Sequence, residues 1–259
     1  MFRGFNLKID GNPFGSSDSH IRNDVQAIDD RISRTISSFS RTDGKLDGTK
    51  IKANWFPCDH ADVFISHSRA DRDLAIGLAG WIKHNFELTS FIDSCVWGHA
   101  DKLLGLIDRT YCYNPSSETF IYKKRNLSTS HVHMMLSTAL SEMIDKSECI
   151  IFLNTPRSID ANDSINNPST HSPWIYSEIS MTKLVRKHNP REVIALEKRH
   201  ITEGSPTLAL MYDLDLDHLT GLNQGDLRNW LNAKGSPKYL GAHNLDILYD
   251  LKKEAIHGS

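Results

Sequence analysis

The stretch that decides the fold is residues 62–71, which read DVFISHSRAD. Its first half, Asp62-Val63-Phe64-Ile65-Ser66, is rich in β-branched and aromatic residues and predicts a short buried strand. Ser68-Arg69-Ala70-Asp71 has the spacing of a capping box, which begins helices. The apolar residues that follow share one helical face: Leu74, Ala75, Leu78, Trp81 and Ile82. The stretch therefore predicts a strand that leads directly into an amphipathic helix.

The same alternation of strand and helix continues along the chain. Phe91-Ile92-Asp93 predicts a second short strand, and Cys149-Ile150-Ile151-Phe152-Leu153 predicts a third, buried on both faces. Val193-Ile194-Ala195-Leu196 predicts a fourth strand. The intervening helices are predicted near residues 101–107, 132–143 and 173–187. Alternating strands and helices form βαβ units, so the predicted fold class is α/β, a flavodoxin-like, doubly wound parallel sheet.

The N-terminal part of the chain carries weaker patterns. Residues 1–20 are rich in Gly, Ser, Asn and Asp, and we expect a loop or a loosely docked arm. Apolar residues at helical spacing predict an amphipathic helix at residues 20–39. Residues 40–53 are polar with two glycines, which is typical of a linker or turn.

Two internal segments and the C-terminal part complete the predicted organisation. Residues 111–130 are expected to hold a hairpin around Phe120, and residues 155–172 a long polar loop. Short helices are predicted from Leu227 to Leu231 and from Leu245 to Leu251. We divide the chain into an N-terminal arm and helix (1–57), the α/β domain (58–204) and a helical C-terminal extension (205–259).

Composition and charge narrow the functional classes. The formal net charge of -2 produces no general attraction to nucleic acid, so we expect no nucleic-acid partner, and local groups must hold any phosphate. No apolar run approaches the roughly 20 residues that span a bilayer, and residues 1–11 lack the apolar core of a signal peptide. We therefore expect a cytoplasmic protein with no membrane partner. None of the four cysteines forms a C-x-x-C pair, so reduced thiols are expected.

Ligands of doubly wound sheets bind at the carboxyl ends of the strands, near the topological switch point. Polar and aromatic residues that follow the predicted strands are the candidates for this edge: Ser66, His67, Ser68, Asp93, Trp97, Asn154 and Trp174. Trp174 and Glu178 are four positions apart and share one helix face, so a carboxylate is expected beside an aromatic wall.

Each of these residues also has a structural interpretation. Ser68 is expected to cap the next helix, and Asp93 is equally well explained as a cap of its strand. Trp174 can be a core residue, and Glu178 can be an exposed carboxylate that is favoured near a helix N-terminus.

Several motifs of other enzyme classes are missing from the sequence. It contains no G-x-x-x-x-G-K-[ST], no G-x-G-x-x-G after a strand, no G-x-S-x-G and no H-E-x-x-H. His131 and His133 begin a predicted helix two positions apart and therefore face different ways, and we assign no metal role to them or to His99 and His171. We expect neither a metal site nor a bound cofactor.

The motifs together resemble the TIR (Toll/interleukin-1 receptor) domain family, over roughly residues 60–200. Residues 62–68 resemble its first strand and following loop, and residues 91–107 resemble its second strand, BB loop and second helix. Residues 149–154 resemble the next core strand. Ser172-Pro173-Trp174-Ile175-Tyr176-Ser177-Glu178 resembles the segment in which a tryptophan precedes the catalytic glutamate by four. The chain differs from the family pattern in the inserted residues 111–130, in a BB loop without proline (Ser94 to His99) and in Ile175, where many members have cysteine.

The resemblance implies an enzyme that cleaves the nicotinamide–ribose bond of NAD, with Glu178 as the catalytic carboxylate. It implies substrate contacts from the strand-end residues named above. One ionised carboxylate suits this reaction because it stabilises an oxocarbenium-like ribose. Similar bacterial proteins of the Thoeris type make ADP-ribose-type nucleotides, cyclic ones included, as second messengers that activate an effector in anti-phage defence. They commonly self-assemble, so a homo-oligomer is expected.

Two other functions remain open at this stage. The chain can be a TIR-type interaction module that scaffolds partners without turnover, and such a module has no need of Glu178 at its position. A nucleotide-processing hydrolase of flavodoxin-like fold is the weaker alternative, because it requires a metal or a phosphate cradle that the sequence lacks. The product, the trigger and the effector do not follow from the sequence.

Overall fold

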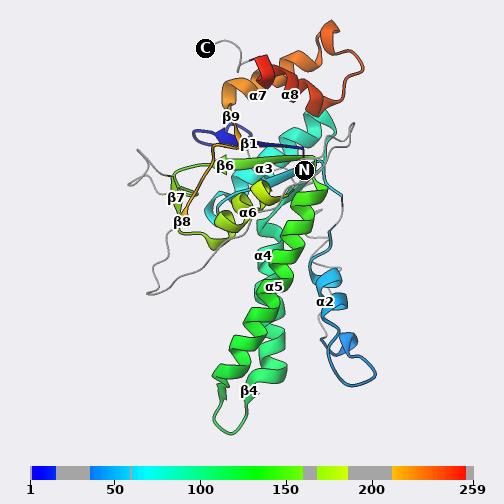
Figure 1. The fold of residues 1–259 in the computed structure, drawn as a ribbon, viewed down its shortest axis with the longest axis vertical. Coiled ribbons are helices and arrows are strands. Elements are labelled where there is room, and N and C mark those ends of the chain that lie inside the picture. Colours follow the sequence, from blue (N-terminus) through cyan, green and yellow to red (C-terminus); the bar gives the residue numbers. More distant parts are fainter. Residues whose placement is uncertain (1, 16–35, 59, 160–167, 186–211, 255–259) are drawn as a thin grey trace.

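The computed structural model describes residues 2–15, 36–58, 60–159, 168–185 and 212–254 (Figure 1). Its strands are β1 (Arg3–Lys8), β2 (Val63–Ser66), β3 (Ser90–Ile92), β4 (Tyr113–Asn114), β5 (Thr119–Phe120), β6 (Cys149–Asn154), β7 (Ser169–Thr170), β8 (Tyr212–Asp213) and β9 (Thr220–Asn223). Its α-helices are α2 (Gly48–Trp55), α3 (Arg72–Phe86), α4 (Ser94–Ile107), α5 (Tyr122–Lys146), α6 (Pro173–Leu184), α7 (Gln224–Lys234) and α8 (Asn244–Glu254). Shorter helical segments are η1 (Ile36–Phe39), η2 (Arg69–Asp71), the π-helical η3 (Asp108–Cys112) and η4 (Pro237–Tyr239).

Five strands form one all-parallel sheet in the order β3-β2-β6-β1-β9. Every residue of β2 is buried, and so is β6 up to its last residue. Strands that are covered on both faces need apolar side chains at successive positions, which accounts for the unbroken run in β6. The predicted strands at residues 62–66, 91–93 and 149–153 are confirmed, whereas the one at residues 193–196 lies outside the described residues.

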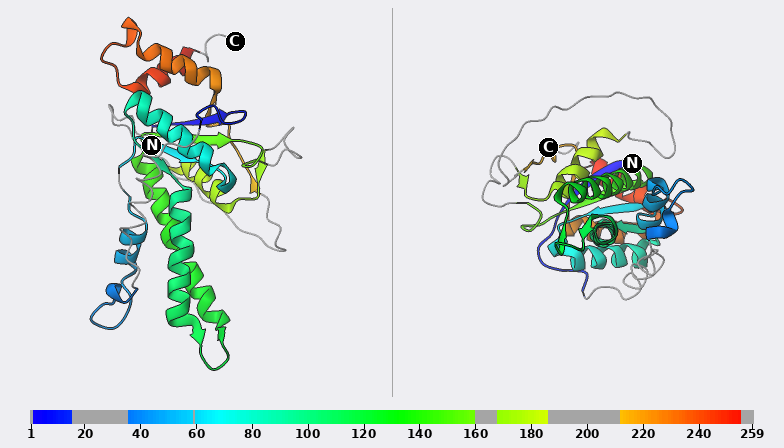
Figure 2. Two further views of the ribbon diagram at one scale, coloured as in Figure 1. Left: turned by 180° about the vertical axis from the view of Figure 1, so that it is seen from behind. Right: turned by 90° about the horizontal axis from the view of Figure 1, so that it is seen from below.

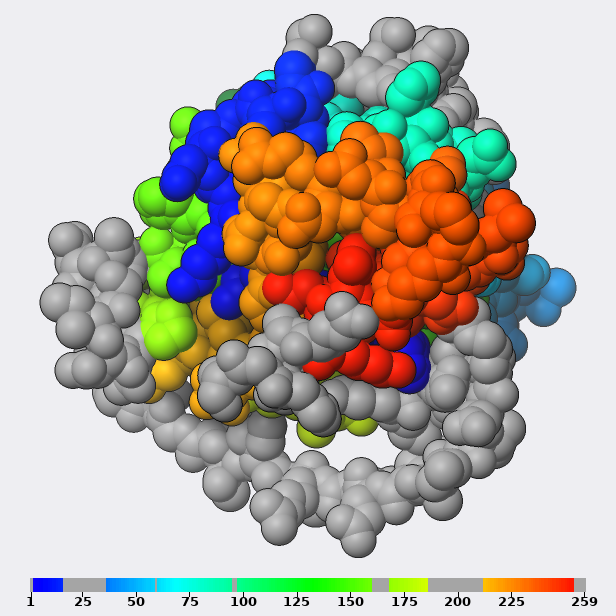
Figure 3. Space-filling model, turned by 90° about the horizontal axis from the view of Figure 1, so that it is seen from above, coloured from blue at the N-terminus to red at the C-terminus, as the bar shows by residue number. Residues whose placement is uncertain are grey.

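Helices cover both faces of the sheet (Figures 1 and 2). On one face, α3, α7 and α8 pack against Val63, Ile65 and Ile151. On the other face, α2, α4 and α5 pack against Phe64, and α6 packs against Phe152. This division follows from the alternation of side chains along each strand. Figure 3 looks onto α7 and α8, which lie beside the N-terminal segment.

The predicted fold class is confirmed as a flavodoxin-like α/β fold. From β2 the chain passes through α3 to β3 on one side, and it then returns through α4 and α5 to β6 on the other side of β2. The direction of winding therefore changes between β2 and β6, which makes this pair the topological switch point. The loops that follow these two strands meet at the carboxyl edge of the sheet.

The prediction of a loosely docked N-terminal arm at residues 1–20 is wrong for its first half. Residues 3–8 form β1, which lies between β6 and β9, with Phe5 opposite Ile151. Phe5 and Leu7 are fully buried, and they alternate with Gly4, Asn6 and Lys8. This period of two is a strand signal that the polar composition of residues 10–20 obscured.

The segments that follow β1 differ in part from the predictions. Most of the predicted helix at residues 20–39 lies outside the described residues, and its end forms η1. The predicted linker at residues 40–53 is wrong at its end, because α2 begins at Gly48. Asp47 caps this helix by accepting a hydrogen bond from the Lys50 amide at 3.1 Å, and Ile51 and Trp55 bury its apolar side.

The expected BB loop from Ser94 to His99 is also wrong. The helix α4 begins at Ser94, directly after β3 and Asp93. Trp97, Ala100, Leu103 and Ile107 are buried at helical spacing, so the stripe that the sequence indicated from residue 101 starts earlier.

A long helical hairpin projects from the sheet and is the most extended feature of the molecule (Figure 1). It consists of α4, η3, the β4–β5 hairpin and α5, so the hairpin that was predicted around Phe120 is confirmed. The helix α5 begins at Tyr122 rather than near Val132. Asp108 joins the two arms by accepting hydrogen bonds from Arg125 Nε at 2.9 Å and from Ser128 Oγ at 2.5 Å.

The C-terminal part contains the two predicted helices, α7 and α8, together with a strand that the sequence analysis missed. Thr220–Asn223 forms β9 at the edge of the main sheet, paired with β1. The main sheet therefore contains strands from all three predicted parts of the chain, residues 1–57, 58–204 and 205–259. The division of the chain into these parts stays a prediction. Among the described residues, no helix is long and apolar enough to cross a membrane.

The place of β1 in the sheet leads to a stability prediction. Leu7→Ala removes a fully buried side chain and should lower the free energy of unfolding by about 2–5 kcal/mol. The exposed neighbour provides the control, since Lys8→Ala should change it by less than about 0.5 kcal/mol. Chemical denaturation measures both, and equal stabilities of the two variants would show that β1 is only loosely attached.

Candidate functional site

Four of the predicted site residues form one buried cluster at the carboxyl edge of the sheet: Ser66, His67, Asp93 and Glu178. Each is at most 2% exposed. Ser66 ends β2 and shares the sheet face of Phe64, which is the face that α6 covers. Its Oγ donates a hydrogen bond to Glu178 Oε2 at 2.6 Å. This bond joins β2 to α6, the helix that carries Glu178.

The start of α6 follows the sequence prediction. Ser172 is the N-cap and accepts a hydrogen bond from the Ile175 amide at 3.3 Å, and Pro173 occupies the first turn. Ile175 and Ile179 pack against Phe152 and hold the helix on the sheet. Glu178 lies on this packed side, so its interpretation as an exposed carboxylate is wrong.

Asp93 joins the segments that follow β2 and β3. Its Oδ1 lies 2.6 Å from His67 Nδ1, and its Oδ2 accepts a hydrogen bond from the His67 backbone amide at 3.3 Å. Asp93 is fully buried, as is His67, so these contacts fix the two side chains against each other.

Burial controls the protonation of this cluster. It raises the pKa of Asp93 to about 8, and burial together with the Asp93 charge raises the pKa of Glu178 well above its usual range, against the Ser66 hydrogen bond. Burial also lowers the pKa of His67 to about 4, so the imidazole is neutral at pH 7. Carboxyl groups whose pKa is strongly raised by burial are the kind of perturbed groups that gather at functional sites.

A cavity of about 640 Å³ lies beside the cluster. The described residues that line it are Ser68, Arg69, Ala70, Trp97, Pro156, Arg157, Ser158, Ile159, Thr170, His171, Ser172 and Trp174. Trp97 stacks on His67, with ring centroids 6.1 Å apart, and it therefore lies between the cavity and the cluster. Glu178 does not line the cavity and is covered in this structure.

The other predicted site residues have different positions. Trp174 is half-buried, lines the cavity and contacts His133 edge-on at 5.6 Å, so it is both a core and a cavity residue. Asn154 is not brought to the cavity. Its side-chain amide donates a hydrogen bond to Asn6 Oδ1 at 2.9 Å, which joins β6 to β1.

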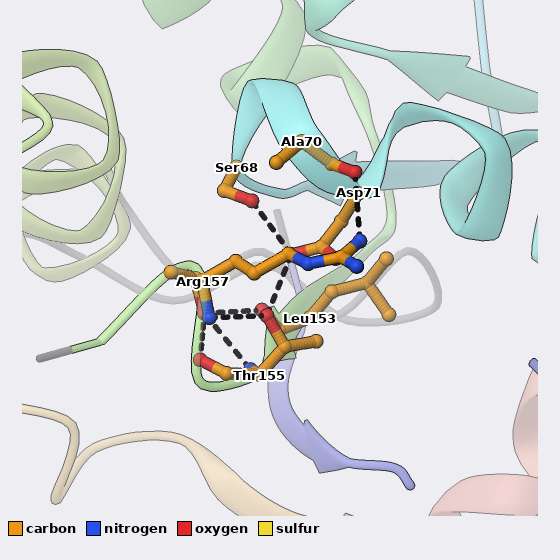
Figure 4. Close-up of polar contacts among 7 residues, drawn as sticks. Ser68, Ala70, Asp71, Leu153, Thr155 and Arg157 are labelled. Atoms are coloured by element: carbon orange, nitrogen blue, oxygen red, sulfur yellow. Dashed lines mark hydrogen bonds and ion pairs between the residues drawn. The ribbon is translucent and has the colours of Figure 1, made fainter. Parts of the chain in front are cut away.

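Ser68 directly precedes η2 as its N-cap residue but does not form the predicted capping box. Its Oγ donates a hydrogen bond to Asp71 Oδ2 at 2.6 Å, where a capping box would have the side chain of Ser68 accept from the Asp71 amide. Thr155 Oγ1 donates to the same Asp71 oxygen at 2.6 Å, and Arg157 Nη1 lies 3.3 Å from Asp71 Oδ1 (Figure 4). The sequence analysis missed this cluster, because Asp71 lies 84 positions from Thr155 and 86 from Arg157, across the switch point.

Metal ligation has no candidate in the described part of the chain, where no group of three or more His, Cys, Asp or Glu residues is placed to hold an ion. The chain matches no protein-family model, and no significant similarity links it to a curated protein or to a solved structure.

The raised pKa of Asp93 predicts a pH-dependent stability. The folded protein keeps a proton that the unfolded chain releases above about pH 4, so this group destabilises the fold increasingly as pH rises toward its folded pKa of about 8. Asp93→Asn removes the effect, and its advantage over the wild type should grow by up to about 1.4 kcal/mol per pH unit between pH 5 and 8.

Chemical denaturation at a series of pH values tests this prediction. Asp101→Asn serves as the control because Asp101 is exposed and pairs with the equally exposed Arg69 at 3.4 Å. The stability of this variant should run parallel to that of the wild type. If the stability of Asp93→Asn also ran parallel to that of the wild type, Asp93 would be ionised in the folded protein and the prediction would be wrong.

Proposed function

We propose that this protein is a TIR-type enzyme that cleaves the nicotinamide–ribose bond of NAD, with Glu178 as the catalytic carboxylate. The observation that carries the proposal is the buried cluster of Ser66, Asp93 and Glu178 at the carboxyl edge of the sheet, beside a cavity with two tryptophans. The order and spacing of the TIR-like motifs from residue 62 to residue 178 support the same function.

The chemistry suits a single carboxylate. Cleavage breaks the bond between C1′ of the ribose and the nicotinamide nitrogen, and the electron pair leaves with the nicotinamide, which becomes neutral. The ribose acquires oxocarbenium character, which an ionised Glu178 stabilises. Burial raises the pKa of Glu178 and so disfavours this ionised form in the empty site. A cationic nicotinamide ring placed beside it lowers its pKa and favours the ionised form.

The surrounding residues have separate roles in this proposal. The Ser66 hydroxyl orients Glu178 through its 2.6 Å hydrogen bond, and Asp93 positions His67. Trp97 and Trp174 provide flat apolar walls for the nicotinamide ring. Because Trp97 separates the cavity from His67, we infer that its ring shifts when the substrate reaches Glu178.

The identity of the attacking nucleophile determines the product. Water yields ADP-ribose, whereas a group of the substrate itself yields a cyclic ADP-ribose isomer. We propose that the product is a soluble signal that activates a nucleotide-sensing effector in anti-phage defence of the Thoeris type, in the cytoplasm and with the enzyme as a homo-oligomer. This part of the proposal rests on the resemblance of the motifs alone.

A TIR-type interaction module is the second candidate function. The helical hairpin favours it, because its far end exposes aromatic and aliphatic side chains: Tyr111, Tyr113, Phe120, Ile121, Tyr122, Leu127 and Met134. A module of this kind does not need the buried Glu178, so turnover separates the two candidates.

The first test compares Glu178→Gln with the wild type. The amide keeps the size of the side chain but cannot ionise, so nicotinamide release from NAD should fall by at least about 100-fold. Mass spectrometry of the products identifies what attacks the ribose. Glu118→Gln, at the exposed hairpin, is the matched control and should keep full activity. Equal activity of the two variants would remove Glu178 from the mechanism, and an inactive wild type would favour the interaction module.

The pH profile is a second, independent test. Glu178 must lose its proton to act, and its pKa is raised, so kcat/KM should increase with pH, about tenfold per unit below the midpoint. The midpoint should lie above the ordinary range of a glutamate. Asp93→Asn removes the neighbouring negative charge and should move the midpoint to lower pH. A profile that is flat from pH 5 to 9 would contradict this mechanism.

A further inference from the structure

A second cavity, of about 500 Å³, lies at the same edge of the sheet. The described residues that line it are Ile9, Asp10, Gly11, Asn12, Ala70, Asp71, Asp73, Leu74, Thr155, Pro156 and Arg157. Three residues line both cavities, namely Ala70, Pro156 and Arg157. They form a ridge between the two spaces, and this ridge stands at the switch point between β2 and β6.

The guanidinium of Arg157 is fixed on this ridge from one side. Its Nη1 donates hydrogen bonds to the Ala70 carbonyl oxygen at 3.0 Å and to Asp71 Oδ1 at 3.3 Å (Figure 4). Asp71 is buried and is itself held by the hydroxyls of Ser68 and Thr155. The Arg157 side chain nevertheless remains 64% exposed. A cation that is held in place while most of its surface meets solvent is preorganised to bind an anion.

The two cavities differ in charge. The first is lined by Arg69 and Arg157, with no carboxylate among its described lining residues. The second contains the carboxylates of Asp10, Asp71 and Asp73. An anionic group is therefore favoured at the ridge and disfavoured in the second cavity, where carboxylates can accept hydrogen bonds from sugar hydroxyls.

We propose that Arg157 anchors the phosphates of a dinucleotide that lies across this ridge, with one nucleoside half in each cavity. An arginine fork matches the geometry of phosphate oxygens. Both cavities have the size of small-molecule sites, which typically measure about 300–1,000 Å³. This inference rests on the proposed function and deepens it. The nicotinamide riboside occupies the first cavity, next to the Glu178 cluster, and the adenosine occupies the second, with its ribose hydroxyls on Asp10.

Calorimetric binding of product fragments tests the anchor without turnover. Arg157→Ala should weaken binding of ADP-ribose and of nicotinamide mononucleotide by about 10- to 100-fold, because each loses a charge-assisted contact to phosphate. Adenosine, which has no phosphate, should bind as it does to the wild type. Arg157→Lys keeps a cation beside Asp71 but lacks the fork and should show a smaller loss. Arg228→Ala, an exposed arginine on α7, is the control and should change nothing.

Asp10→Ala tests where the two halves lie. This exposed residue borders only the second cavity, so its loss should weaken ADP-ribose and adenosine several-fold and leave nicotinamide mononucleotide unchanged. An equal effect on all three ligands, or none, would overturn the assignment of the adenosine half.

The outcomes separate this inference from the proposed function. Wild-type protein that binds ADP-ribose through Arg157 but releases no nicotinamide supports the anchor and refutes the enzyme. Active protein whose Arg157→Ala variant keeps both its affinity for ADP-ribose and its KM for NAD refutes the anchor and leaves the enzyme intact. Wild-type protein that does not bind ADP-ribose refutes the anchor.

Discussion

The hydrogen bond that Ser66 donates to Glu178 at 2.6 Å is the interaction on which the candidate site depends. It joins the end of β2 to α6, and Asp93 joins the end of β3 to the loop after β2 through His67. Burial raises the pKa of both Asp93 and Glu178, so the site disfavours their ionised forms. The arrangement costs stability at neutral pH, and a fold retains such a cost most readily where a function requires it.

The ridge between the two cavities uses charge in a different way. Asp71 is buried, but three donors from the two loops after β2 and β6 surround it, so the ridge is held by complete hydrogen bonding. The loops that meet there follow β2 and β6, and parallel strands bring their carboxyl ends to one edge. The topology of the sheet therefore places the Glu178 cluster and the Arg157 guanidinium on neighbouring parts of the same edge.

The helical hairpin extends the fold away from this edge. Its base packs in the core through residues such as Leu103 and Leu140, whereas its far end exposes Tyr122 and Leu127. Asp108 ties its arms together, which keeps the projection ordered where the sheet no longer supports it. The candidate site and the exposed aromatic and aliphatic side chains of the hairpin therefore lie on separate parts of one chain.

Features that depend on neighbours in the chain were determined by the sequence itself. The strands at β2, β3 and β6, the Ser172 cap and the shared helix face of Trp174 and Glu178 all follow from backbone geometry, which repeats every two residues in strands and every 3.6 in helices. Only the tertiary structure decided that β1 and β9 join the main sheet and that Glu178 is buried. It also decided that Asn154 bonds to Asn6 and that Asp71 contacts Arg157. These pairings join residues dozens of positions apart or more, and local periodicity contains no information about which distant segment will satisfy a buried hydrogen bond or an open strand edge.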